Sequence, residues 1–194
     1  MTLRQQWLVV ALILGSLLGV VAIGAYAMRD ELFPVEVGSR APDFAARTVD
    51  GTNEVRTLED YRDKVVVLNI WATWCAPCIV EMPSFERLHR MFPESELRIV
   101  AVSIDDFVGA DSVRNYAQGL GLTFDILHDS THAIERTYQV TGYPETFVIA
   151  RDGTIRKKWI GPAEWDSPAN VALIRELLGL GPPAGVAPAR EGWQ

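Results

Sequence analysis

Hydrophobic and polar positions divide the chain into stretches of different character. Residues 7–28 (WLVVALILGSLLGVVAIGAYAM) carry no charge, and at about 1.5 Å per residue a helix of this length spans the roughly 30 Å hydrocarbon core of a membrane. Short apolar runs then alternate with helical patterns. Residues 181–194 (GPPAGVAPAREGWQ) have no apolar period and are rich in Pro, Gly and Ala. These patterns predict a membrane segment at 1–28, a tether at 29–37, one folded domain at 38–180 and a disordered tail at 181–194.

The N-terminal stretch is predicted to be an uncleaved anchor. Arg4 and the free amine precede the uncharged run, and Arg29, Asp30 and Glu31 follow it, and this weakly favours an inside N-terminus and an outside domain. A cleaved signal peptide is the alternative, because Ala25 and Ala27 form a small-x-small site. Signal h-regions usually run about 7–15 residues, however, and this run is longer. Length therefore favours an anchor that contacts the lipid bilayer through residues 7–28.

Apolar runs in the folded part predict a sheet with two hairpins. The runs with strand character cover 43–49, 53–57, 65–70, 97–104, 123–127, 146–150 and 154–160. Asp50-Gly51 separates the first two runs and Asp152-Gly153 the last two, and both pairs are typical of the turn in an antiparallel hairpin. The third and fourth runs are continuous and β-branched, which is typical of buried strands.

Helical patterns alternate with these strands. We expect one helix from the cysteines to about Met91 with a kink at Pro83, and shorter helices at 112–118, 132–138 and 168–179. Ser167 followed by Pro168 is typical of a helix start, and Gly179 of a helix end. Thr57 and Asp60 also resemble a helix-start cap. Together these elements indicate an α/β fold with a mixed central sheet covered by helices on both faces.

Composition and charge exclude several functions. The chain has 18 basic and 25 acidic side chains, which give a net charge of −7 and a pI near 5.0, and it has no basic run. Nucleic acid is therefore not an expected partner, because binding phosphates requires clustered Lys and Arg. The hydrophobic content of 48% is enough for a core, and two cysteines are too few for a disulfide-stapled scaffold.

Both cysteines lie in one short motif, WATWCAPC, at residues 71–78. Cys75 follows a predicted buried strand and opens a predicted helix, with Pro77 suited to the first turn. The positive end of a helix dipole stabilises a thiolate and lowers its pKa to about 3.5–7.5. Cys78 is expected one turn later and deeper. We therefore predict a redox-active disulfide in which Cys75 is the nucleophile and Cys78 is the resolving cysteine.

A metal site and a structural disulfide are weaker interpretations of the same pair. Zinc requires about four ligands, and His128 and His132 lie about 50 residues beyond Cys78, outside the usual spacing. A structural disulfide between residues three positions apart closes a very small loop and adds little stability. We expect no metal and no cofactor other than the disulfide itself.

The order and spacing of short motifs resemble the thioredoxin superfamily, and within it the membrane-anchored TlpA/ResA/CcmG (DsbE)-like thiol-disulfide oxidoreductases. The resemblance covers nearly all of residues 38–180. It is carried by GSRAPDF (38–44), VVLNIWATWCAPC (66–78), Glu81 with Pro83, DILHD (125–129) and YQVTGYPETFVIARDGTI (138–155). It implies a thioredoxin-like fold with an N-terminal hairpin and a central helix-strand insertion within residues 105–140.

By the same resemblance, Pro144 is expected to be a cis proline facing the disulfide, with the backbone of Tyr143 available to pair with an extended substrate. The cis form costs little only at X–Pro bonds. An ordinary turn proline is the alternative interpretation of Pro144. Trp74 is expected at the surface as a lip of the site, whereas Trp71 is interpreted either as a wall of the site or as core packing.

Two departures from related families bear on the mechanism. Thioredoxin carries a buried aspartate where this chain has Asn69, and an amide cannot accept the proton of the resolving cysteine. Glu81 and Glu145 are the candidates that tune the pair, although each is also open to interpretation as a solvated surface carboxylate. Peroxiredoxins, which share the APDF start, carry Thr or Ser and Pro where this chain has Ala72 and Leu68. Peroxidase activity is therefore not expected.

These observations indicate an enzyme that exchanges disulfides with protein partners outside the cytoplasm, with a tethered peptide-binding module as the alternative. GYPETF (142–147) is closest to the CcmG branch, which implies reduction of apocytochrome c before haem attachment. General reduction of periplasmic disulfides is the alternative substrate range. The resemblance also implies a single-pass inner-membrane protein whose domain faces the periplasm and is reduced again by a membrane electron donor.

Overall fold

The computed structural model describes residues 2–27 and 34–181, in two units that are considered separately. Residues 29–33 of the predicted tether lie outside the described residues, as does the predicted disordered tail from residue 182 onward. The second unit begins at Val35 rather than at residue 38, and the side chain of Val35 is buried in the core of the domain.

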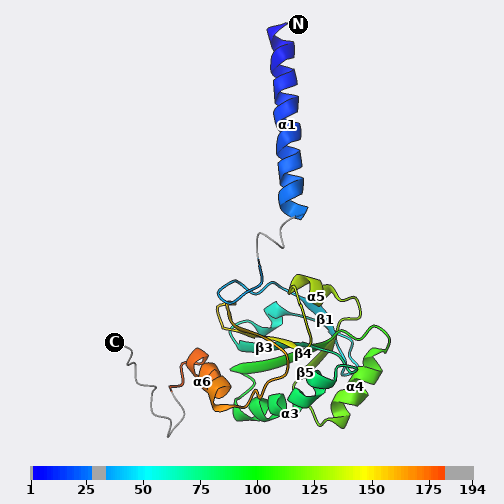
Figure 1. Ribbon diagram of the computed structural model, residues 1–194, viewed down its shortest axis with the longest axis vertical. Helices are drawn as coiled ribbons and strands as arrows, with labels where there is room; N and C mark the ends of the chain where they lie inside the picture. Colours follow the sequence, from blue (N-terminus) through cyan, green and yellow to red (C-terminus); the bar gives the residue numbers. More distant parts are fainter. Residues whose placement is uncertain (1, 28–33, 182–194) are drawn as a thin grey trace. The chain divides into compact units, whose positions relative to one another are not determined.

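The first unit is one apolar helix, α1 (Leu3–Ala27), drawn in blue in Figure 1. Its span from Leu3 to Tyr26 contains an 18-residue window with a mean hydropathy of 2.7, and by length and composition it suffices to cross a membrane. The helix begins at Leu3, before the uncharged run. In its first turn the N–H groups of Gln5 and Gln6 donate to the carbonyl of Thr2, at 2.8 and 3.1 Å. The chain therefore has one N-terminal helix with the properties of an anchor or a signal sequence.

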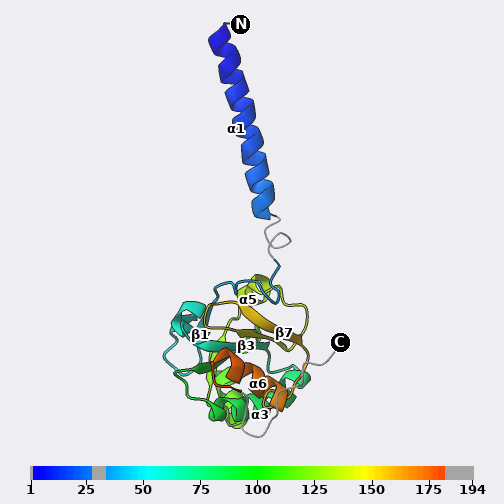
Figure 2. The ribbon, with the colours of Figure 1, turned by 90° about the vertical axis from the view of Figure 1, so that its left-hand side faces the viewer.

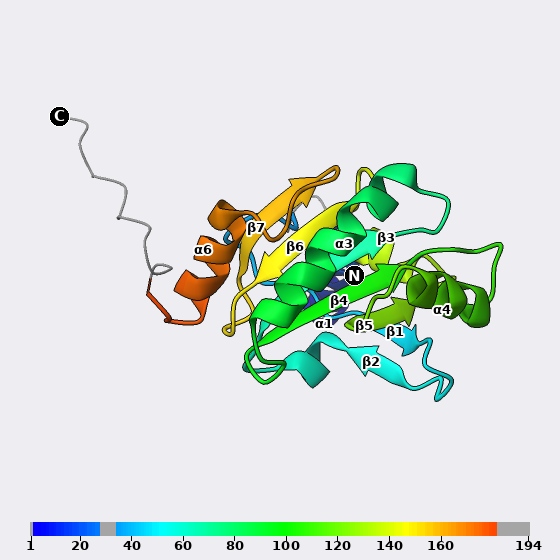
Figure 3. The same cartoon turned by 90° about the horizontal axis from the view of Figure 1, so that it is seen from below.

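Seven strands form one mixed sheet in the second unit (Figures 1 and 3). They are β1 (Ala45–Thr48), β2 (Val55–Thr57), β3 (Val65–Trp71), β4 (Leu97–Ser103), β5 (Asp125–His128), β6 (Glu145–Ile149) and β7 (Ile155–Ile160), in the order β2-β1-β5-β4-β3-β6-β7. β3, β4 and β5 run parallel, whereas β6 is antiparallel to β3. Both predicted hairpins, β1-β2 and β6-β7, are present, and the predicted mixed α/β sheet is confirmed.

Helices cover both faces of this sheet. α3 (Ala76–Met91), α4 (Ala110–Gly119) and α6 (Pro168–Leu177) lie on one face and α5 (Ala133–Thr137) lies on the other, as Figures 1 and 2 show, while the short 3-10 helix η1 (Leu58–Tyr61) follows β2. The predicted caps are present. Thr57 N–H donates to Asp60 Oδ2 at 2.7 Å, and Ser167 Oγ accepts the N–H of Asn170 at 3.5 Å. α3 runs through Pro83 to its predicted end.

The insertion between β4 and α5 contains the expected helix and strand, with different limits. β5 begins at Asp125 instead of Thr123. The N–H and the hydroxyl of Thr123 both donate to the carboxylate of Glu86, each at 2.8 Å, so Thr123 is held against α3 and does not pair in the sheet. α5 begins at Ala133 because His132 has a left-handed backbone, with φ of 57°, which a right-handed helix does not continue.

The sheet brings three loops to one edge. All residues of β3 are buried, between β4 and β6. Because β3 and β4 are parallel, both end at this edge, where Ile104 N–H donates to the Trp71 carbonyl at 3.0 Å. β6 runs the other way and begins at the same edge, with Glu145. The cysteine motif, the loop after β4 and the loop before β6 therefore meet there.

Candidate active site

Cys75 and Cys78 form a disulfide at the start of α3. Their sulfur atoms are 2.06 Å apart and their Cα atoms 5.3 Å apart. Cys75 is the N-cap residue of α3, its Sγ accepts the N–H of Cys78 at 3.3 Å, and Pro77 occupies the first turn. Cys75 is 5% exposed and Cys78 is 0% exposed. Cys75, the predicted nucleophile, is thus the more exposed of the two cysteines.

The loop before the first cysteine is held by Asp105, a residue that sequence reasoning missed. Asp105 follows β4 and is buried. Its carboxylate accepts the N–H of Thr73 at 3.0 Å, the hydroxyl of Thr73 at 2.7 Å and the hydroxyl of Ser103 at 2.6 Å. These bonds tie the β3–α3 loop to the end of β4. No local signal could identify Asp105, because Thr73 lies 32 positions earlier in the chain.

A cis proline and two aromatic rings lie at the same edge of the sheet as the disulfide. The Tyr143–Pro144 peptide bond is cis, the isomer that the family resemblance implied. The carbonyl of Pro144 accepts the N–H of Gly161 at 2.8 Å, which joins this loop to the end of β7. The ring of Tyr143 meets the ring of Trp74 edge-on, with 5.8 Å between centroids, and Trp74 is 59% exposed. The structure therefore brings Trp74, the chain neighbour of Cys75, into contact with Tyr143, the chain neighbour of Pro144.

Trp71 belongs to the core. It is fully buried, and its ring lies 6.4 Å from the ring of Tyr116 on α4. Of the two interpretations of Trp71, core packing is therefore the correct one.

Glu81 lies one turn after Cys78 on α3, in a buried polar network. Its Oε1 accepts the side-chain amide of Asn69 at 2.9 Å, and its Oε2 accepts the indole N–H of Trp165 at 3.0 Å and the N–H of Ala163 at 3.2 Å. Burial raises the pKa of Glu81 to about 7, because desolvation of the charged form outweighs the stabilisation from these three donors. Asn69 thus acts as a donor to a carboxylate with a raised pKa.

Glu145 is also buried, but its side chain lies on the other face of the sheet. Thr146, the next residue of β6, accepts the amide of Asn69 at 2.9 Å. Because successive residues of a strand point to opposite faces, Glu145 points away from the Asn69 network. Its Oε2 accepts the N–H of Thr141 at 2.9 Å, and its Oε1 lies 3.3 Å from Nζ of Lys158.

Glu81 and Glu145 are both buried, which contradicts their alternative interpretation as surface groups. Glu81 is 2% exposed and Glu145 is 0% exposed, so their interpretation as solvated surface groups is wrong. Sequence reasoning also missed their main partners. Trp165 lies 84 positions after Glu81, and nothing in the local pattern of β7 distinguishes Lys158 from its basic neighbours.

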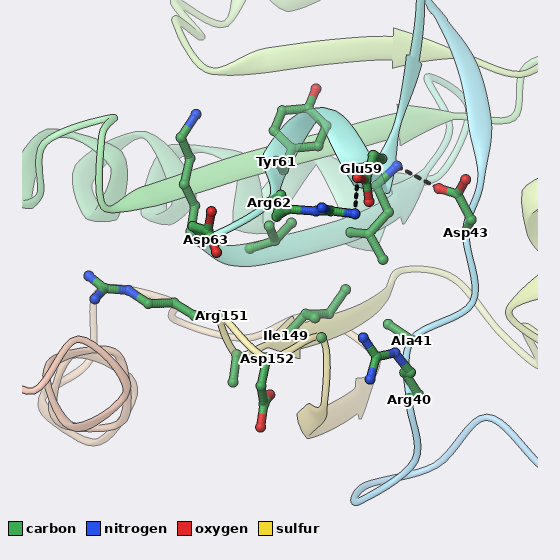
Figure 4. Close-up of a pocket in the computed structure, with 15 residues that line it drawn as sticks. Arg40, Ala41, Asp43, Glu59, Tyr61, Arg62, Asp63, Ile149, Arg151 and Asp152 are labelled. Atoms are coloured by element: carbon green, nitrogen blue, oxygen red, sulfur yellow. Dashed lines mark hydrogen bonds and ion pairs between the residues drawn. The ribbon is translucent and has the colours of Figure 1, made fainter.

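A hollow of about 550 Å³ lies at the opposite end of the sheet (Figure 4). Side chains of both charges line it, among them Arg40, Arg62, Asp43 and Asp152. It lies at the start of β3, and this strand is roughly 20 Å long, so the hollow is remote from the disulfide. Within residues 2–27 and 34–181, no group of three or more His, Cys, Asp or Glu side chains is placed to hold a metal ion.

The fold and the paired cysteines together define a thioredoxin-like thiol-disulfide oxidoreductase. The AhpC/TSA family matches residues 37–158, and the chain belongs to this family. Ala72 and Leu68 nevertheless stand where we expect the Thr or Ser and the Pro of a peroxidase. The chain is thus an enzyme of the thiol-disulfide oxidoreductase type within the family.

Its relatives agree with this class. The chain is 36% identical over 156 residues to the thiol-disulfide oxidoreductase ResA of Geobacillus thermodenitrificans, a match that covers 79% of this chain and 87% of that protein. It is 38% identical over 128 residues to the thioredoxin-like protein YneN of Bacillus subtilis, which covers 66% of this chain and 73% of YneN. The chain is therefore similar to a thiol-disulfide oxidoreductase and to a thioredoxin-like protein over more than two thirds of the length of each.

Solved structures extend the similarity to the fold. A candidate thiol:disulfide interchange protein DsbE from Chlorobium tepidum superimposes with a TM-score of 0.61 and 26% identity, covering 74% of this chain and 95% of that chain. The lipoprotein thioredoxin Etrx1 of Streptococcus pneumoniae superimposes with a TM-score of 0.55 and 26% identity, covering 72% and 100%. The protein is accordingly a thiol-disulfide oxidoreductase of the ResA/DsbE type with a CxxC pair.

Proposed function

We propose that the protein is a reductant of protein disulfides outside the cytoplasm. The Cys75 thiolate attacks one sulfur of the partner's disulfide, and the partner's other sulfur leaves as a thiolate. The Cys78 thiol then loses its proton, attacks Sγ of Cys75 and releases the second partner sulfur. Two electrons pass to the partner, and the protein is left with the Cys75–Cys78 disulfide. The observation that supports this cycle is the disulfide at the N-cap of α3, at the sheet edge that also carries Trp74 and the cis proline.

Glu81 is the group that accepts the Cys78 proton in this proposal. The two residues are three positions apart on α3, so their side chains lie on neighbouring parts of the same helix face. A carboxyl with a pKa of about 7 can take up and release a proton near neutral pH. Glu145 was the other candidate. Its place on the opposite face, paired with Lys158, favours Glu81.

The partner is an extended protein segment that lies against the rim of the site. The backbone at Tyr143, next to the cis bond, is available for strand-like pairing, and the exposed ring of Trp74 provides apolar contact. No metal or cofactor takes part, because the disulfide itself carries the two electrons.

Apocytochrome c is the substrate that the sequence favours. Haem thioethers form only from free thiols, whereas an oxidising compartment drives cysteines toward disulfides. A Glu directly after the cis proline, in GYPETF (142–147), is the feature that resembles the CcmG branch. Similarity to proteins named ResA and DsbE supports thiol-disulfide exchange, the chemistry that this substrate requires. The alternative substrate range is periplasmic disulfides in general.

The proposed location is the inner membrane, with α1 as an uncleaved anchor and the catalytic domain in the periplasm. α1 is long and apolar enough for this role. Each cycle leaves the enzyme oxidised, so a membrane electron donor that supplies a dithiol must restore it. Anchoring keeps the enzyme close to such a donor.

Reduction of a synthetic peptide with an intramolecular Cys-x-x-Cys disulfide tests the activity. We expect the reduced wild-type protein to produce two peptide thiols per molecule and the Cys75→Ser variant to produce none. No turnover by the wild type, together with unchanged peptide binding by Cys75→Ser, would identify a peptide-binding module instead. A reduction potential near that of DsbA, about −120 mV, would reverse the proposed direction of electron flow.

Staining of membranes for covalently bound haem tests the substrate. We expect a strain that lacks the gene to lose c-type cytochromes and to regain them when an external thiol is added. Normal cytochromes in that strain without added thiol would exclude this substrate, while the peptide assay would still report on the oxidoreductase activity.

A further inference from the structure

Glu145 closes the loop that carries the cis proline. Its Oε2 accepts the N–H of Thr141 at 2.9 Å, so a single side chain joins the two ends of the segment 141–145 around Pro144. The residue is fully buried, and Oε1 accepts no hydrogen bond from the part of the chain that the structure describes. A carboxylate buried in this way requires a compensating positive charge.

Lys158 supplies that charge. Its Nζ lies 3.3 Å from Glu145 Oε1 and donates to the carbonyl of Val35 at 3.1 Å. In the β6-β7 register Lys158 is opposite Phe147, so its side chain emerges on the same sheet face as Glu145, two residues away. The ammonium also lies 5.5 Å above the ring of Phe147. One cation thus contacts the proline loop and the point where the chain enters the domain.

The neighbouring basic residues of β7 make no such contact. Lys157 points to the opposite face, where its Nζ donates to Asn170 on α6 at 2.6 Å. Arg156 is exposed to solvent. A buried carboxylate that loses its partner is left uncompensated, and this strongly destabilises its surroundings. The three basic positions of this strand therefore differ in what their removal should do.

We propose that Lys158 is a positioning residue for partner binding. The ammonium of Lys158 neutralises the carboxylate of Glu145 and so holds it where it accepts the N–H of Thr141. This hydrogen bond in turn keeps the backbone at Tyr143 in the position that pairs with a substrate. The inference rests on the proposed reductase function for its kinetic consequence, but the structural consequence for the loop is independent of it. A misplaced loop affects protein partners, which pair with it, and spares small disulfides, which reach Cys75 directly.

The kinetic test compares two disulfides on the full-length protein in detergent. Loss of the cation should lower the rate constant for the Cys-x-x-Cys peptide at least about tenfold in Lys158→Met, because small displacements of positioning groups have effects of this size. The rate with the small aromatic disulfide DTNB should change less than about twofold, since no loop pairing is involved. Lys158→Arg should recover most of the peptide rate. Arg156→Met, which removes a charge from the same strand, is the matched control and should match the wild type.

A double variant separates charge compensation from packing. Glu145→Gln removes the buried charge and retains an oxygen to accept Thr141 N–H. If Lys158 acts through this charge, Glu145→Gln/Lys158→Met should show the peptide rate of Glu145→Gln alone, a coupling that a mutant cycle detects. A double variant as impaired as Lys158→Met overturns the proposal, since Lys158 would then act through Val35 or Phe147 and not through the charge of Glu145. If Lys158→Met does not fold, recovery of a folded protein in the double variant supports the proposal, and failure to recover it overturns the proposal.

Hydrogen exchange at the Thr141 amide provides a readout without turnover. We expect exchange at least about tenfold faster in Lys158→Met than in the wild type, and a return toward the wild-type rate in the double variant. Unchanged exchange overturns the positioning role whatever the kinetics. A wild-type protein that does not reduce the peptide overturns the proposed function, while exchange at Thr141 still decides the role of Lys158.

Discussion

At the scale of single residues, two buried carboxylates have different surroundings because of the sheet face on which each lies. Glu81 receives three N–H donors and no cation among the described residues, and burial raises its pKa to about 7. Glu145 lies on the other face and has an ammonium 3.3 Å away. The first can exchange a proton at neutral pH, and the second can hold a loop.

Replacing Glu81 by Gln should remove a pH dependence of stability. A pKa raised from 4.5 to about 7 means that the folded protein keeps a proton that the unfolded chain releases. This contribution to the free energy of unfolding is complete below about pH 4.5 and is lost as pH rises through 7, and its size is about 3 kcal/mol. Urea unfolding of the oxidised protein at pH 4.5, 6 and 8 should show this loss for the wild type and little of it for Glu81→Gln.

Glu176→Gln is the control for this measurement, because Glu176 is exposed on α6. Its profile should follow the wild type. If Glu81→Gln also follows the wild type, burial of Glu81 does not govern its titration, and the proposed proton acceptor loses its basis.

The two cysteines should differ in reactivity. Cys75 is the more exposed cysteine and sits at the N-terminus of α3, where a thiolate is stabilised. In the reduced protein near neutral pH, an alkylating reagent should label Cys75 first, as peptide mass mapping would report. Cys78→Ser should trap mixed disulfides with partners, and Cys75→Ser should trap none. Faster labelling of Cys78 would reverse the two roles.

At the scale of elements, the site depends on how the β3–α3 loop is held. The loop crosses from a buried strand to the N-cap at Cys75, and its backbone is fixed by the carboxylate of Asp105 from the end of β4. The parallel pairing of β3 and β4 places both loops at one edge of the sheet. The orientation of the disulfide therefore depends on a neighbouring strand as well as on α3.

Asp105→Ala should destabilise the protein by about 3 kcal/mol, because it leaves the N–H and the half-buried hydroxyl of Thr73 and the buried hydroxyl of Ser103 without their acceptor. Asp106→Ala is the matched control. The side chain of Asp106 is 41% exposed and lies 3.7 Å from His132, so its loss should change the free energy of unfolding by about 0.5 kcal/mol at most. Denaturant unfolding of both oxidised variants provides the comparison, and equal effects would show that Asp105 does not hold the loop.

At the scale of the whole molecule, charge and hydrophobicity are divided between the two units. Beyond residue 28 the chain has 17 basic and 25 acidic residues, a net charge of −8. Such a surface is not attracted to anionic lipid. In the proposed membrane location, attachment therefore comes from α1, which contains an 18-residue window with a mean hydropathy of 2.7.

The full-length protein should resist extraction from membranes by high salt and dissolve only in detergent, because apolar burial, unlike charge attraction, is not screened by salt. Intact-mass measurement should find the N-terminal helix still attached, and a reporter fused to the C-terminus should be active only outside the cytoplasm. A mature N-terminus at Met28 would contradict the anchor and identify a cleaved signal peptide.

Sequence alone determined the elements and the reacting pair, because their signals are local. Apolar periodicity located the strands and helices, Asp-Gly pairs marked both hairpins, and Ser167-Pro168 marked the start of α6. The order of Cys75 and Cys78 at a strand-to-helix junction was enough to predict which cysteine is more exposed. The strand limits were wrong at β5, where Thr123 is held by Glu86 from 37 positions away.

Tertiary structure alone decided the surroundings of the pair. Glu81 meets Trp165 across 84 positions, Thr73 meets Asp105 across 32, and Lys158 binds the carbonyl of Val35 across 123. None of these contacts has a periodic signal, since each forms only when separate elements pack together. Desolvation, which sets the pKa of Glu81, likewise exists only once α3 and the Trp165 segment have excluded water from the carboxylate.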